Sequence, residues 1–198
     1  MKTMTARRLE LFLVITLASI LSACASSPAP RYFRLAAPAD LAVTPDQGAS
    51  GRAVIIGPFQ LAEYLDRPQI VARDGANGII VTDYERWAEP LDANFQAVVA
   101  TNVGQLLGSD RVLEFPATTI LKADRRVTGR ISRLDVDAGG LAVLVVQWGI
   151  LDGHGAVSRP GIVSRYEARA SDAGAAARVA ALNVTVVEFS ADVAAAVR

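Results

Sequence analysis

The sequence predicts an α/β fold, namely a single domain with a mixed β-sheet packed by two main helices. Residues 112–166 are rich in β-branched residues, in runs separated by glycine turns, which favours strands. Residues 91–107 and 175–197 repeat apolar side chains at helical spacing. Helices with one apolar face bury that face against a sheet, so these elements are expected to share one core.

The two helices are predicted from their apolar stripes. Pro90 and Asp92 suit the start of the first helix, and Gly108 suits its end. In the second helix, alanine-rich turns surround the stripe, and its spacing outweighs a β-branched run at 184–187. The stripes consist of Leu91, Phe95, Val98, Val99, Leu106 and Leu107, and of Val179, Leu182, Val186, Phe189 and Val193.

Six or seven strands are expected to form the sheet. Gly57-Pro58 should stop the strand at 53–56, and the long apolar strand at 141–151 should be central and covered on both faces. Tight turns are predicted at 137–140 and 152–155. The other expected strands cover 31–35, 79–83, 127–136, 157 and 162–166.

The N-terminal residues predict an exported, lipid-anchored protein. A basic start precedes an apolar run at 11–21, which is shorter than the roughly 20 residues that cross a membrane. The run ends in Leu21-Ser22-Ala23-Cys24, which resembles the bacterial lipobox. Residues 1–23 are therefore expected to be a lipoprotein signal peptide, 24–30 a lipidated tether attached through Cys24, and 31–198 one periplasmic domain. An ordinary signal followed by an incidental cysteine is the alternative.

Composition excludes several classes of function. Removing the leader takes three basic residues and one acidic residue from the 20 of each kind, which leaves a net charge of −2. This balance argues against nucleic-acid binding. Beyond the leader no stretch is expected to cross a bilayer, and the single cysteine has no disulfide partner. About 175 residues remain after the leader, enough for one ordinary domain.

No residues suggest a catalytic or metal site. His154, the only histidine, lies between two glycines, and we expect it to be an exposed turn residue without a nucleophile beside it. Asp135 and Asp137 lack the further oxygen ligands of a calcium loop, and we expect them to be a solvated turn. The sequence therefore predicts no catalytic residue, no metal and no cofactor.

The segment between residues 57 and 91 is dense in Tyr, Trp, Arg and Pro, which is the composition of a contact surface. It is expected to be largely nonregular, and it could equally be an apolar plug that covers a sheet edge. The candidate partner or oligomer interface consists of Glu63, Tyr64, Leu65, Asp66, Arg67, Pro68, Gln69, Arg86 and Trp87.

Two motifs in this segment resemble a known family. Glu-Tyr-Leu-Asp-Arg-Pro-Gln-Ile-Val at 63–71 and Arg-Trp-Ala-Glu-Pro-Leu at 86–91 resemble the PqiC-type lipoproteins, also called ABC-type transport auxiliary lipoproteins. Ala62 departs from the family's usual proline, which weakens any inference about rigidity of that loop. The resemblance covers essentially the whole mature chain, with further agreement at Tyr32, Leu35 and Gln147-Trp148.

The resemblance implies a noncatalytic accessory lipoprotein of an MCE/ABC-type envelope transport system for lipid or organic solvent. Its implied partners are a periplasm-spanning MCE protein and an inner-membrane permease, and some members form homo-oligomeric rings. Ala25, which is not aspartate, favours the periplasmic face of the outer membrane over inner-membrane retention. A periplasmic carrier that binds lipid, or an envelope hydrolase, are the alternative functions.

Overall fold

The structure, a computed structural model, describes residues 28–39, 41, 51–117 and 122–198. Cys24 and the expected signal peptide lie outside the described residues. Residues Arg31–Arg198 form one compact unit, and the predicted fold is confirmed: a single α/β domain with a mixed eight-stranded sheet and two helices.

The order of elements alternates strands with two helices. Both helices have the predicted bounds, α2 at Leu91–Leu107 and α3 at Ala175–Val197. The strands are β1 Arg31–Phe33, β2 Val54–Leu61, β3 Gln69–Asp74, β4 Gly78–Trp87, β5 Val112–Glu114, β6 Arg125–Asp137, β7 Leu141–Asp152 and β8 Val157–Arg169.

Strand β6 organises the sheet. Along one edge it pairs with β7, which in turn pairs with β8, both antiparallel. Along the other edge its first half pairs with β2 in parallel, and β5 follows beyond β2. The far end of that same edge pairs with β3 only at Ala72–Val136 and Arg73–Asp137. The β3–β4 hairpin, with β1 parallel to β4, is therefore attached to the sheet through a short contact.

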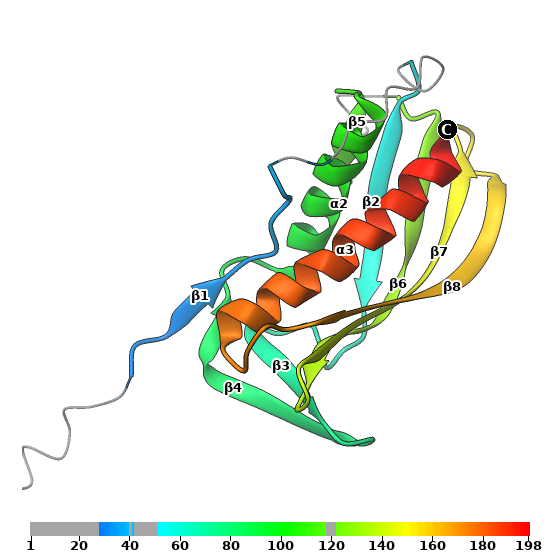
Figure 1. The fold of residues 1–198 in the computed structure, drawn as a ribbon. Coiled ribbons are helices and arrows are strands. Elements are labelled where there is room, and N and C mark those ends of the chain that lie inside the picture. The colour runs from blue at the N-terminus through cyan, green and yellow to red at the C-terminus, as the bar shows by residue number, and fades with distance from the viewer. Residues whose placement is uncertain (1–27, 40, 42–50, 118–121) are drawn as a thin grey trace, which may run out of the picture. The chain divides into compact units, whose positions relative to one another are not determined.

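Both helices lie on the same face of the sheet, as Figure 1 shows. Phe189 of α3 lies at the centre of the core, with ring centroids 5.7 Å from Phe95, 5.8 Å from Phe59 and 5.5 Å from Trp148. The predicted apolar stripes are buried, except that Leu106 is only partly covered. This layer of aromatic rings joins α2 and α3 to β2 and β7.

Three predictions about the strands are wrong. Strand β2 does not stop at Gly57-Pro58 but continues to Leu61 through a register shift between Ile56 and Phe59. Gly57 has φ +110°, and a Cβ there would lie 1.8 Å from Gln96 Oε1, so the bend requires glycine. The segment expected to be largely nonregular contains β3 and the whole of β4, of which only 79–83 was predicted as a strand. Strand β7 was expected to be covered on both faces, but the helices cover only one face, and Gln147 is exposed on the other.

Helix α3 also corrects the expectation that no stretch beyond the leader is apolar enough to cross a bilayer. Among the described residues it alone meets the length and composition of a membrane span, with a mean hydropathy of 1.5. Half of its apolar window is buried inside the domain. The composition of α3 is therefore also that of a core helix.

Candidate partner-binding groove

The two motifs, which lie apart in the sequence, meet in the folded chain. Trp87 N–H donates a hydrogen bond of 2.7 Å to the carbonyl oxygen of Pro68, and Gln69 pairs with Arg86 across β3 and β4. Between them is a hollow of about 350 Å³. We call it the motif groove; it is lined by Asp66, Arg67, Pro68, Trp87, Ala88, Glu89, Pro90 and Leu91.

Local hydrogen bonds and buried anchors hold the two walls of the motif groove. In the turn after β2, Leu65 N–H donates to the Ala62 carbonyl at 2.8 Å, and the Leu65 side chain is only 2% exposed. On the opposite wall, Trp87 is 6% exposed and Leu91 is 4% exposed, both within the core. These apolar side chains anchor both walls in the domain, so the groove is a built feature of the fold.

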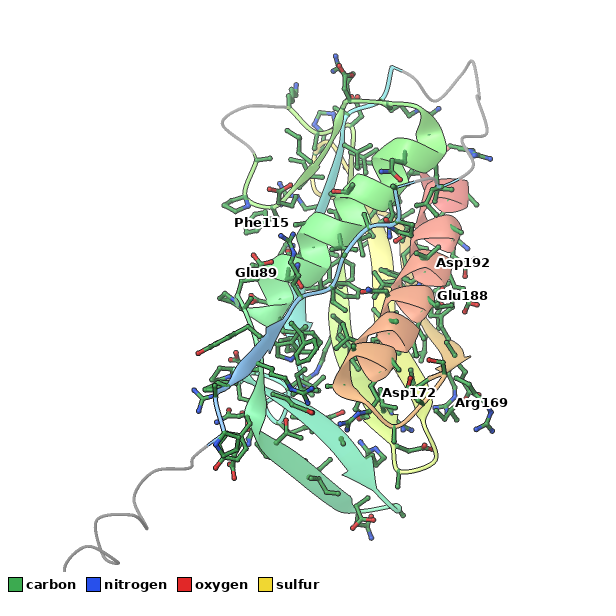
Figure 2. The ribbon with its side chains drawn as sticks, turned by 60° about the vertical axis from the view of Figure 1, so that its left-hand side comes forward. Glu89, Phe115, Arg169, Asp172, Glu188 and Asp192 are labelled. Carbon is green, nitrogen blue, oxygen red and sulfur yellow. The ribbon has the colours of Figure 1, made fainter. Side chains whose placement is uncertain are left out.

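The rim of the motif groove is charged and accessible. Glu63, Asp66, Arg67 and Pro68 are exposed, whereas Gln69 and Arg86 are half-buried. The Asp66 and Arg67 side chains form no hydrogen bond or ion pair with any described residue. Glu89, labelled in Figure 2, stands just before α2, with Oε1 3.8 Å from Arg34 Nε. Charged side chains that the fold leaves unused are available to a partner.

Tyr64 is directed into the domain. Its hydroxyl donates to Asp135 Oδ2 at 3.0 Å, and Asp135 is fully buried. The same carboxylate accepts hydrogen bonds from Arg73 Nη2 at 3.2 Å and from Arg133 Nε at 2.8 Å. The prediction of a solvated turn is therefore wrong for Asp135, which connects the turn after β2 with β3 and β6. Asp137 does serve the turn, accepting the Leu141 N–H at 2.9 Å.

The interface prediction therefore separates into two groups. Tyr64, Leu65 and Trp87 make contacts inside the domain, and their positions indicate a structural role. The other predicted residues reach the surface around the motif groove, where contact with a partner stays a prediction. Glu89 lines the motif groove and belongs to the second motif, but it was not among the residues predicted for the interface. Its place two residues after Trp87, within the second motif, was the available signal.

The environment of Tyr64 predicts a pH effect. Burial, reinforced by the negative charge of Asp135, raises the pKa of Tyr64 from 10.0 to about 12. The folded state therefore holds this proton more tightly than the unfolded chain, so the stabilisation is complete below pH 10 and is lost as pH rises toward 12. We expect the stability advantage of the wild type over Tyr64→Phe to shrink between pH 10 and pH 12.

Urea unfolding measured at several alkaline pH values tests this expectation. The exposed Tyr84 provides the control, since Tyr84→Phe should follow the wild type across the same pH window. The difference in the free energy of unfolding between the wild type and Tyr64→Phe should therefore fall from pH 9 to pH 12. A difference that stays constant over this range would contradict the predicted linkage.

The remaining candidates show no sign of catalysis among the described residues. His154 is exposed in the turn between β7 and β8, as predicted, and its backbone N–H donates to Asp152 Oδ1 at 2.9 Å. No group of three or more His, Cys, Asp or Glu side chains that could hold a metal occurs in the described part of the chain.

Comparison with solved structures finds proteins that share this fold. Two crystal structures share the α/β fold: an uncharacterized protein, with a TM-score of 0.70 at 17% identity, and protein XCC0632 from Xanthomonas campestris, with a TM-score of 0.68 at 16% identity. The first match covers 86% of this chain and 100% of the other, and the second covers 83% and 92%. A comparison with curated proteins gave no match.

The family follows from the sequence match. The model of the ABC-type transport auxiliary lipoprotein component matches residues 33–194, a range that contains both motifs, all of α2 and all but the last three residues of α3. The chain belongs to this family of transport auxiliary lipoproteins. The resemblance drawn from the two motifs is thereby confirmed.

Proposed function

We propose that this protein is a noncatalytic docking component of an MCE-type envelope transport system for lipid or organic solvent. In this proposal Cys24 carries the lipid that anchors the domain to the periplasmic face of the outer membrane. The motif groove then contacts the periplasm-spanning MCE protein, or a neighbouring copy in a homo-oligomeric ring. The inner-membrane permease completes the system, and the domain itself needs no cofactor.

The observation that carries the proposal is the meeting of both family motifs at one groove. Its walls are anchored by buried Leu65, Trp87 and Leu91, whereas its rim presents Asp66 and Arg67, whose side chains have no partner among the described residues. An apolar floor with a polar rim is the usual arrangement of a protein interface. Charges of both signs on the rim favour a partner with complementary charges and fix its register.

The double variant Asp66→Ala/Arg67→Ala tests the role of the groove. We expect recovery of the MCE partner, after crosslinking and purification in mild detergent, to fall by about tenfold or more, because charge-assisted contacts at an interface contribute roughly 1.5–3 kcal/mol each. The free energy of unfolding should change by less than about 0.5 kcal/mol, since neither side chain has a partner in the part of the chain that the structure describes.

The matched control is Asp110→Ala/Arg111→Ala, which removes an adjacent, exposed pair of the same charges away from the groove. This control should recover the partner as the wild type does. A wild-type chain that captures no MCE protein or permease would refute the docking function. A groove variant that loses stability together with the partner would instead indicate a structural role for the pair.

A further inference from the structure

The face of the sheet opposite the helices carries a row of basic side chains. Neighbouring residues of a strand point to opposite faces. Val127 and Ile131 of β6 are buried in the core under the helices, so Arg126 and Arg130 point the other way. Lys122 lies just before this strand and lines the same surface as Arg126. We call Lys122, Arg126 and Arg130 the basic strip.

The three cations of the basic strip lack partners within the described part of the chain. None of them forms an ion pair or a side-chain hydrogen bond with another described residue. Arg126 Nε is buried and has no described acceptor, while the guanidinium lies 5.8 Å from the ring centroid of Phe115. No carboxylate among the described residues therefore pairs with Arg126.

Asp124 and Asp152, which line a hollow together with Lys122, accept hydrogen bonds from the backbone. Asp124 Oδ2 accepts the Ala53 N–H at 2.8 Å. Asp152 Oδ1 accepts the N–H groups of His154 and Ala156, each at 2.9 Å. These bonds hold both carboxylates at turns and chain crossings, and neither carboxylate forms an ion pair with a residue of the basic strip.

The surface is also hollowed beside these cations. One hollow of about 370 Å³ is lined by Lys122 and Arg126, and a second of about 400 Å³ by Arg130 and Gln147, with Leu151 common to both. In the second hollow, a Cβ on Gly149 would lie 2.9 Å from the backbone oxygen of Arg159. Glycine therefore permits the close packing of β7 against β8 there.

Neutral donors and apolar surface complete the second hollow. Gln60, Arg130 and Gln147 are neighbours across β2, β6 and β7, and both amide side chains are exposed. Neither glutamine side chain forms a hydrogen bond with a described residue. Leu151 and the exposed Val157 flank these polar groups. The hollow thus combines cations, amide donors and an apolar side.

We propose that the basic strip binds the phosphate group of an organic phosphate ester. Arginine donates two parallel hydrogen bonds to phosphate oxygens. Arg130, exposed on this face of β6, can supply such a pair, and Arg126 and Lys122 add positive charge along the same face. Gln60 and Gln147 add neutral donors, and Leu151 and Val157 contact the organic part of the ester. The site lies on a different surface from the motif groove and does not depend on the docking function.

Calorimetric titration of the purified full-length chain in detergent tests the proposal with three matched probes. Glycerol 3-phosphate carries the phosphate alone, dihexanoyl phosphatidylglycerol carries phosphate with acyl chains, and dihexanoylglycerol carries acyl chains alone. We expect the phosphate-bearing probes to bind and the phosphate-free probe not to bind. Arg130→Gln should weaken binding by about tenfold, and Arg126→Gln/Arg130→Gln should weaken it further.

The control variant is Arg111→Gln, which removes one exposed positive charge outside the basic strip and should bind as the wild type does. Binding of glycerol 3-phosphate alone would identify a soluble ester, and binding of the acylated phosphate alone would identify a lipid headgroup; both support the site. The proposal is overturned by the absence of binding to either phosphate, by equal binding of dihexanoylglycerol, or by unchanged binding in the folded double variant.

Discussion

Replacement of Asp135 by alanine is expected to lower the free energy of unfolding by about 3–5 kcal/mol, the usual cost of removing one partner from a buried ion pair. The substitution removes the common acceptor of Arg73, Arg133 and Tyr64. Asp135 is fully buried, while the two arginine side chains are 21% and 20% exposed. Both guanidinium groups would therefore lose their counter-ion in a poorly solvated site.

The loss should also loosen the β3–β4 hairpin. Strand β3 pairs with β6 at two positions only, and the Arg73–Asp135 contact reinforces that short junction. Hydrogen exchange should therefore accelerate in β3 and β4 more than in β7. Because the hairpin supplies Trp87 to one wall of the motif groove, partner recovery should fall as well.

Chemical unfolding of Asp135→Ala beside Asp110→Ala measures this effect. Asp110 is exposed and its side chain has no described partner, so the control should change stability by less than about 0.5 kcal/mol. If Asp135→Ala costs no more than the control, the network contributes little net stability. In that case its desolvation would offset the attraction between its charges.

Replacement of Cys24 by serine is expected to abolish lipidation of the protein. A hydroxyl does not replace the thiol that accepts the lipid in a lipobox, and each buried methylene of an acyl chain contributes roughly 0.8 kcal/mol to anchoring. Two chains provide a stable anchor, so their complete loss should move the protein from the membrane fraction to the soluble fraction or leave it unprocessed.

Membrane fractionation and labelling with radioactive palmitate measure the result. Ser26→Ala, just outside the lipobox, is the control and should remain labelled and membrane-bound. Palmitate incorporation into Cys24→Ser at the wild-type level would disprove the assignment of this cysteine. Both variants leave residues 31–198 unchanged, so their folding should be equal to that of the wild type.

The sequence alone was sufficient for the features that depend on neighbouring residues. The bounds of α2 and α3 follow from apolar spacing, because a helix forms its hydrogen bonds within one segment. The turn before β7 follows from its glycines for the same reason, with Gly140 at φ +78°. The resemblance to the family also rests on two contiguous motifs. These motifs were recognisable in the sequence although β3 and the end of β4, which contain parts of them, were not predicted.

The tertiary structure decided everything that depends on strand pairing. No local pattern distinguishes Asp135 in a solvated turn from Asp135 buried between Arg73 and Arg133, because Arg73 arrives from a strand 62 residues away. The same holds for the motif groove, where the bond from Trp87 N–H to Pro68 joins segments that become adjacent only when β3 and β4 pair. Contacts between distant segments depend on the packing of the whole sheet, and short-range periodicity does not encode that packing.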